Sequence, residues 1–273
     1  MSESAQLKDV ERTLWNGIAG RLREGLPVDI FDVTAFAAPA LLERLAPGPG
    51  ARVLDVACGP ARWYGAPAAQ GLALVGLDLS QGMVAEAARR HPSALFVLGD
   101  AEALPFPEAS FDRALCNFAV MHFPDPPAAL AEARRVLRPG GRYAFTTWAP
   151  PASSRLFGSV VEAIMEHAVA SSGLPRAHPT WLYSDPEEAT QVLAGAGFTD
   201  IEVREIPLRI DLSRPEDVVH VVRTTGYTRA TLEAQPPDVQ ERILKLIVER
   251  VSGEHAGGSL RLEIPAVAAV GRT

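Results

Sequence analysis

The 273-residue sequence lacks several features that would place it in a common class of protein. It has two cysteines, Cys58 and Cys116, and neither these nor the six histidines show metal-ligand spacing or a disulfide framework, so we expect a reduced, cytoplasmic protein without a metal. Blocks of lysine and arginine do not go beyond pairs such as Arg89-Arg90, and the net charge is −7, which disfavours a nucleic-acid partner. Apolar runs stay far short of the roughly 20 residues that span a membrane, so we expect no membrane partner.

Two further absences concern targeting and cofactor. The N-terminus MSESAQLKDV has no apolar stretch of the kind found in signal peptides, so secretion is not expected. The fingerprint G-x-G-x-x-G is also missing, which removes the main support for a nicotinamide or flavin cofactor.

Alternating strand and helix patterns organise the middle of the chain. Residues 1–46 read as a helical cap segment, 47–150 as a Rossmann-like core, and 151–273 as the rest of the sheet with helical insertions. Short apolar runs separated by amphipathic segments indicate a parallel sheet with helices on both faces. The expected strands are 52–57, 73–77, 94–98, 113–118, 142–147, 201–212 and 264–271.

The first predicted strand ends in the sequence DVACGPA, residues 55–61. An acid is followed by small residues at alternate positions, Ala57, Gly59 and Ala61, so a ligand can lie against this backbone. The next helix would then present free N–H groups to that ligand. A buried strand that simply ends in a turn explains the same letters equally well.

Two more acids follow predicted strands. Asp78 comes 23 residues after Asp55, at the distance where a carboxylate grips the hydroxyls of a ribose, although it also suits the helix that Ser80 would cap. Asp100 can accept from an exocyclic amine while the Ala101 N–H donates to a ring nitrogen, which would identify adenine; a solvated loop acid is the alternative. Since parallel strands deliver all three acids to one edge of the sheet, the set is more specific than any member.

With these motifs in place, residues 53–149 resemble the class I S-adenosylmethionine-dependent methyltransferases, in particular the small-molecule group that includes ubiquinone-type and natural-product enzymes. The resemblance is carried by VLDVACGPA, GLDLSQGM, GDAEALPFPEASFD, NFAVMHFPDP and LRPGGRYAF. It implies a seven-stranded sheet of order 3-2-1-4-5-7-6 with the seventh strand antiparallel, and S-adenosyl-L-methionine as the cofactor.

The resemblance also implies roles for individual residues. The loop from Asp55 would face the methionine part of the cofactor, and Asp78 would hold the ribose. The implied cofactor-binding set is Asp55, Ala57, Gly59, Ala61, Asp78, Leu79, Met83, Asp100, Ala101 and the backbone of Asn117. Ala61 departs from the family's third glycine, and its methyl group would either narrow the sulfonium pocket or fit. The helix expected after it contains Gly65 and Pro67, which are poor helix-interior residues.

A candidate catalytic residue follows the fourth predicted strand. A histidine side chain ordinarily has a pKa suited to a general base, so His122 is the candidate to take the proton of the methyl acceptor. A purely structural role of His122 in its loop is an equal alternative. Phe36, Phe118 and Trp148 are the candidate substrate residues. Further aromatic and apolar side chains expected to set specificity are Trp15, Phe31, Phe157, Met165, Trp181 and Tyr183.

The sequence therefore predicts a cytoplasmic enzyme that methylates O, N or C of a small, fairly apolar molecule, such as a secondary metabolite. A methyltransferase-fold enzyme that transfers no methyl group, such as a cyclase, and a non-catalytic partner subunit are the alternatives. We expect a monomer or homodimer, with the helical insertion at 213–258 serving as a cap over the site or as a dimer face.

Overall fold

A computed structural model describes residues 2–22, 28–253 and 259–273. Its centre is a seven-stranded sheet of order β3-β2-β1-β4-β5-β7-β6, as predicted. β7 pairs antiparallel with both β5 and β6, and the other pairings are parallel. The strands are β1 (Arg52–Val56), β2 (Ala73–Asp78), β3 (Leu95–Leu98), β4 (Phe111–Asn117), β5 (Leu137–Trp148), β6 (Thr199–Leu212) and β7 (Leu260–Arg272).

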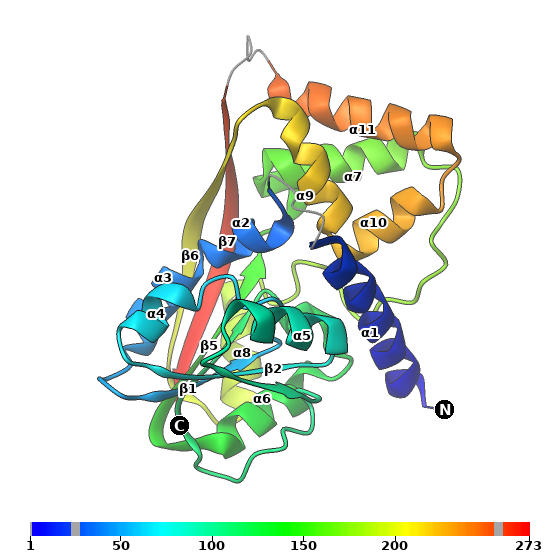
Figure 1. The fold of residues 1–273 in the computed structure, drawn as a ribbon. Helices are drawn as coiled ribbons and strands as arrows, with labels where there is room; N and C mark the ends of the chain where they lie inside the picture. Colours follow the sequence, from blue (N-terminus) through cyan, green and yellow to red (C-terminus); the bar gives the residue numbers. More distant parts are fainter. Residues whose placement is uncertain (1, 23–27, 254–258) are drawn as a thin grey trace.

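Helices cover both faces of the sheet and build a separate layer above one end of it (Figure 1). Those between the parallel strands are α4 (Gly65–Ala69), α5 (Gln81–Arg90) and α6 (Pro126–Val136). The N-terminal helices are α1 (Glu3–Arg21), α2 (Ile30–Ala35) and α3 (Ala38–Leu45). The later helices are α7 (Arg155–His167), α8 (Pro186–Gly195), α9 (Val218–Thr224), α10 (Gly226–Glu233) and α11 (Pro237–Ser252).

The central strands owe their place to continuous apolar runs. In β1 and β2 every residue after the first is buried, which is the pattern of strands covered on both faces. The acids that end them, Asp55 and Asp78, are buried as well, at 1% and 8% exposure. Two carboxylates therefore stand at the carboxyl edge of the sheet, out of bulk water.

Helix starts follow the sequence signals in most places. Ser80 caps α5 by accepting from the Met83 N–H, and Asp185 caps α8 by accepting from two backbone N–H groups. In the N-terminal region the sequence predicts that Thr34 caps a helix running to Leu45, and the structure differs. Asp29 caps α2 instead, in a capping box with Asp32, and Thr34 lies inside that helix. Pro27, expected with Asp29 to interrupt the region, lies outside the described residues.

The two long strands at the end of the chain also refine the predictions. The apolar pattern of residues 201–212 changes phase and by itself predicts a bulge near Glu205, but the pairing of β6 with β7 shifts between Thr199 and Glu202 and is regular from there on. The change of phase in the apolar residues has another cause: Val203 is partly buried on one face, and Ile206 and Leu208 are buried on the other. β6 is an edge strand, which accommodates Pro207 as predicted.

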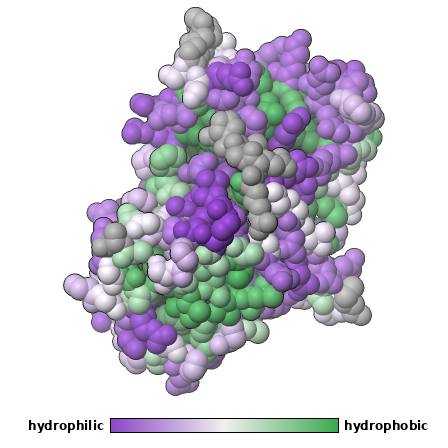
Figure 2. All heavy atoms as spheres, in the orientation of Figure 1, coloured by the Kyte–Doolittle hydropathy of each residue, from purple (hydrophilic) through white to green (hydrophobic). Residues whose placement is uncertain are grey.

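The upper helical layer consists of α7, α9, α10 and α11, and α1 lies between it and α5 (Figure 1). α10 was not predicted as a separate helix. On the face seen in Figure 2 most of the periphery is hydrophilic, and apolar side chains gather in its lower half. None of the described helices is long and apolar enough to cross a membrane.

Candidate active site

A cavity opens at the carboxyl ends of β1, β2 and β4, beneath α1, α2 and α10, and contains about 1370 Å³ of space including its mouth. Its sheet side is lined by polar groups and small residues, whereas its helical side is rich in aromatic rings. The residues that line the cavity include Lys8, Glu11, Trp15, Phe31, Asp55, Ala57, Gly59, Arg62, Asp78, Leu79, Met83, Asp100, Ala101, Asn117, Phe118, His122, Trp148, Arg176 and Tyr227.

The loop after β1 takes an unusual backbone path. Ala57, Gly59 and Ala61 all have positive φ, at 59°, 54° and 53°. A left-handed conformation costs a residue with a Cβ atom roughly 1–2 kcal/mol, a cost that Gly59 avoids and that Ala57 and Ala61 bear. A Cβ on Gly59 would also lie only 3.1 Å from Cε1 of Phe31, so glycine keeps the cavity wall close to the backbone.

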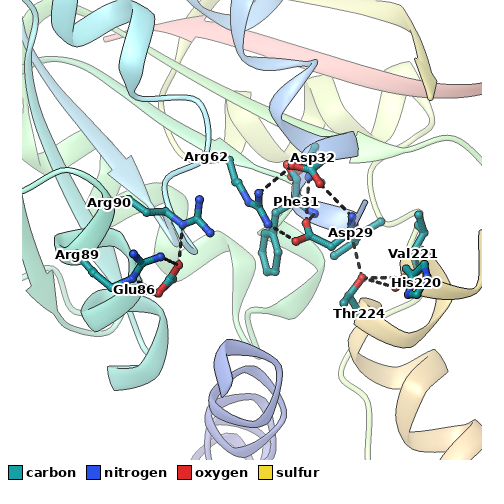
Figure 3. Close-up of polar contacts among 12 residues, drawn as sticks. Asp29, Phe31, Asp32, Arg62, Glu86, Arg89, Arg90, His220, Val221 and Thr224 are labelled. Carbon is teal, nitrogen blue, oxygen red and sulfur yellow. Dashed lines mark hydrogen bonds and ion pairs between the residues drawn. The ribbon is translucent and has the colours of Figure 1, made fainter. Parts of the chain in front are cut away.

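The helix expected after this loop, over residues 62–71, is shorter in the structure. α4 has only five residues and starts at Gly65, so it does not present a helix N-terminus to the cavity as expected. The loop is anchored through Arg62, whose guanidinium pairs with the carboxylates of Asp29 and Asp32 at the start of α2 (Figure 3). In the same view Thr224 of α9 accepts from the Ile30 N–H at 3.0 Å, so α2 links the loop to the helical layer.

Asp55 is the deepest acid of the cavity. Its Oδ2 accepts from the Trp63 Nε1–H at 3.1 Å. Burial raises the pKa of Asp55 well above its usual range, and the nearby charge of Asp78 adds to this shift. The protonated form of Asp55 is therefore favoured far more than in a solvated carboxyl group.

Asp78 connects two of the binding elements. Its Oδ2 accepts from the Gly59 N–H and its Oδ1 from the Ser80 N–H, both at 2.8 Å. Burial raises the pKa of Asp78 to about 6, although these backbone hydrogen bonds and the charge of His122 partly offset that effect. Each oxygen keeps a lone pair that a ligand hydroxyl can use.

Asp100 is held from the N-terminal helix. Lys8 of α1 donates to its Oδ2 at 2.7 Å and also pairs with Glu102 at 2.5 Å. The Glu102 N–H donates to the other oxygen of Asp100 at 2.9 Å. Asp100 is thus a half-buried, paired acid at the cavity wall rather than a solvated loop acid.

The end of β4 builds the opposite wall. The side-chain amide of Asn117 is engaged within the protein, donating to the Thr34 carbonyl at 2.9 Å and accepting from the Thr146 hydroxyl at 2.8 Å. Phe118 follows with φ of 56° and stacks on Trp148, with ring centroids 3.9 Å apart. This pair of rings gives the cavity a flat aromatic surface.

His122 lies beside this surface and contacts two helices outside the sheet. Its Nδ1 is 3.1 Å from the Oε2 of Glu11 in α1. The ring of Trp15 meets the imidazole edge-on at 5.1 Å, and the ring of Tyr227 in α10 lies parallel to it at 6.5 Å.

The structure brings most of the residues singled out by the sequence to one cavity. The exceptions among the candidate site residues are Ala61, which is completely buried behind the loop, and Phe36, which is 56% exposed and does not line the cavity. Of the side chains expected to help set specificity, Met165 and Trp181 are 80% and 39% exposed and stand outside the cavity. Phe157 and Tyr183 do not line it either and pack against the hydrophobic core. The surface positions of Phe36, Met165 and Trp181 follow from helix ends and turns that the sequence pattern did not fix.

The residues of the wall that were not anticipated include four that matter below for charge and proton transfer: Lys8, Glu11, Arg176 and Tyr227. One face of α1 carries Lys8, Glu11 and Trp15 at the spacing i, i+3 and i+7. This spacing could have indicated from the sequence that the three side chains lie together. Charged residues at that spacing are, however, equally typical of a solvated helix face. For Arg176 and Tyr227 the sequence offers no comparable signal.

Comparison with known proteins agrees with this geometry. Residues 54–145 match the family described as a methyltransferase domain. The chain is 34% identical over 258 residues to nocamycin O-methyltransferase of Saccharothrix syringae, covering 85% of this chain and 89% of that protein. It is 33% identical over 167 residues to a demethylmenaquinone methyltransferase of Renibacterium salmoninarum, covering 58% and 70%.

Solved structures show the same fold at low sequence identity. The YcgJ protein of Bacillus subtilis superimposes with a TM-score of 0.56 at 19% identity, covering 87% of this chain and 98% of that one. Phosphoethanolamine N-methyltransferase 2 of Haemonchus contortus, solved with S-adenosyl-L-methionine, gives a TM-score of 0.52 at 19% identity, covering 85% and 51%.

The fold and the cavity define an enzyme that transfers a group from a nucleoside-bearing cofactor. The chain belongs to the class I S-adenosylmethionine-dependent methyltransferases, and S-adenosyl-L-methionine is its cofactor. The cavity fits that molecule: acids end the neighbouring strands, apolar Leu79 and Met83 stand between them, and the loop at Gly59 leaves room at the backbone.

Proposed function

We propose that this enzyme methylates a small, largely apolar acceptor of secondary metabolism, with His122 as the general base. The observation that carries the proposal is the division of one cavity into two sides. Strand-end acids and small residues form the first side, and the aromatic rings around His122 form the second. The relative that spans most of the chain is by name an O-methyltransferase, which favours oxygen as the accepting atom.

On the cofactor side, Asp78 would accept from the ribose hydroxyls through the lone pairs that its backbone bonds leave free. Asp100 and the Ala101 N–H would read the edge of adenine, with Leu79 and Met83 against its faces. Asp55, Ala57 and the Asn117 carbonyl would face the methionine part. Ala61 would act only through the shape of the loop, since its side chain is buried behind it.

On the acceptor side, the cofactor supplies an electrophilic methyl group on a sulfonium. The protein has to exclude water, orient the acceptor and remove its proton. Phe118 and Trp148 provide a stacked surface for an apolar or aromatic acceptor. His122 would take the proton as the acceptor's heteroatom becomes bonded to carbon.

One cation suggests a further property of the acceptor. Arg176 lines the cavity over the ring of Tyr227, at 4.2 Å, and donates to the Thr180 hydroxyl at 3.3 Å. Among the described residues no carboxylate forms an ion pair with it, whereas Arg62 in the same cavity has two. A guanidinium free of a protein carboxylate favours an acceptor that carries an acidic group near its apolar body.

Two measurements test the proposed function. Calorimetry should detect S-adenosylhomocysteine binding in the micromolar range, and mass spectrometry should detect a methylated product among acidic aromatic and polyketide-like acceptors. Binding without any product over a broad acceptor panel would argue for a fold that keeps its cofactor but performs other chemistry. If S-adenosylhomocysteine does not bind, the cavity is not the cofactor site that we propose.

A further inference from the structure

The side chain next to His122 is itself unusual. Glu11 is only 6% exposed, although a buried carboxylate is costly unless it is well paired. Its Oε2 accepts from the Trp15 Nε1–H and its Oε1 from the Tyr227 hydroxyl, both at 2.9 Å. The same Oε2 lies 3.1 Å from His122 Nδ1, which is ion-pair distance for a protonated imidazole, although the ring N–H is not aligned with it for a hydrogen bond. Three side chains thus converge on one carboxylate: Trp15 from α1, Tyr227 from α10 and His122 from the segment after β4.

These contacts determine the charge of Glu11. Burial by itself would raise its pKa, but His122 and the hydrogen bonds from Tyr227 and Trp15 more than offset this, so the pKa of Glu11 lies below its usual value. An ionised carboxylate beside one imidazole nitrogen favours the tautomer with the proton on that nitrogen. It also stabilises the imidazolium that forms when the other nitrogen accepts a proton.

We propose that Glu11 is a positioning residue that holds neutral His122 in the tautomer protonated at Nδ1 and leaves Nε2 free to act as the base. This inference rests on the proposed role of His122. In the step, the acceptor's heteroatom forms a bond to the methyl carbon, and the carbon–sulfur bond breaks with its electron pair on sulfur. The acceptor's proton moves to Nε2, and the imidazolium later releases it to water.

The rings around His122 support a positioning role. Trp15 meets the imidazole at 87° and Tyr227 lies parallel to it within 5°, so the ring is confined from two directions. Both residues also donate to Glu11, and the orientation of carboxylate and imidazole is therefore set together. Neither α1 nor α10 is part of the sheet (Figure 1), so the contact of Glu11 with His122 depends on how α1 packs, and its hydrogen bond from Tyr227 depends on α10 as well.

A spectroscopic experiment tests the tautomer without any acceptor. Long-range proton–nitrogen correlation of ¹⁵N-histidine-labelled protein identifies the protonated imidazole nitrogen, and His122→Asn assigns the signal. The wild type should show His122 protonated at Nδ1 when neutral. Glu11→Ala should shift the population toward the Nε2 tautomer, and Glu11→Gln should largely retain it, because the amide oxygen still accepts. A wild-type signal from the Nε2 tautomer would overturn the inference.

A kinetic experiment tests the consequence for methyl transfer. Glu11→Ala should lower kcat by at least about thirtyfold and Glu11→Gln by about tenfold, with the KM for S-adenosylmethionine within about threefold of wild type. Glu3→Ala is the matched control, since it removes an exposed carboxylate from the same helix. If Glu11→Ala does not fold, Glu11→Gln carries the test.

The two experiments separate the inference from the proposed function. A wild type that binds S-adenosylhomocysteine, shows the Nδ1 tautomer and methylates no acceptor would refute the proposed function and leave the geometry of Glu11 and His122 intact. An active wild type whose Glu11 variants keep kcat within about threefold would refute the role of Glu11 alone.

Discussion

Protonation of Asp78 should control cofactor affinity. The pKa of this buried carboxyl group is about 6, and in the proposed complex only its ionised form can accept from both ribose hydroxyls. One pH unit below its pKa, about one molecule in eleven is ionised, so the Kd for S-adenosylhomocysteine should be about tenfold higher at pH 5 than at pH 7.5. Calorimetric titrations between pH 5 and 8 measure this directly.

The ligand-free protein should respond to pH in the opposite sense. Because burial raises the pKa of Asp78 from 3.8 to about 6, the folded state binds this proton more tightly than the unfolded chain does. Its contribution to stability is therefore fully present below pH 3.8 and is lost as the pH rises through 6, an effect of about 3 kcal/mol. Wild type and Asp78→Asn, compared by denaturant unfolding across this range, should differ by that pH dependence.

A control isolates the group responsible. His122 lies near Asp78 and its charge lowers the Asp78 pKa, so His122→Asn should keep the pH dependence of binding with a midpoint at slightly higher pH. The Asp78→Asn variant should bind S-adenosylhomocysteine weakly at all pH values, and its Kd should not rise further at pH 5. An affinity that is flat between pH 5 and 7.5 in the wild type would refute the link between burial of Asp78 and binding.

Three further outcomes are expected. His122→Asn should lower kcat at least about a hundredfold while the Kd for S-adenosylhomocysteine changes less than about threefold; turnover within a few-fold of wild type would remove the base role. Ala57→Gly should raise the free energy of unfolding by about 0.5–1 kcal/mol, because glycine adopts the left-handed backbone without strain. Ala61→Gly should change the free energy of unfolding little, since the same relief is offset by the loss of a buried methyl group. Denaturant unfolding of the two variants measures the difference. Arg176→Met should raise the KM for acidic acceptors about tenfold and leave neutral ones unaffected, and equal effects on both would contradict charge recognition.

The loop after β1 illustrates how far local sequence carries an argument. Its alternating small residues predicted a close backbone, and the positive φ values of Ala57, Gly59 and Ala61 give the reason. Gly65 and Pro67 already indicated a weak helix after this loop, but only the structure shows that α4 has five residues and that Arg62 before it pairs with Asp29 and Asp32 of another segment.

The sequence by itself determined the strands and the edge of the sheet at which the acids Asp55, Asp78 and Asp100 stand, and its resemblance to the class I methyltransferases supplied the strand order. Apolar runs, turns and strand ends are local signals, and parallel strands must deliver their carboxyl ends to one side. Only the tertiary structure decided what covers that edge. Glu11 and Tyr227 are 216 positions apart, and no local pattern predicts that two helices will bring them onto His122.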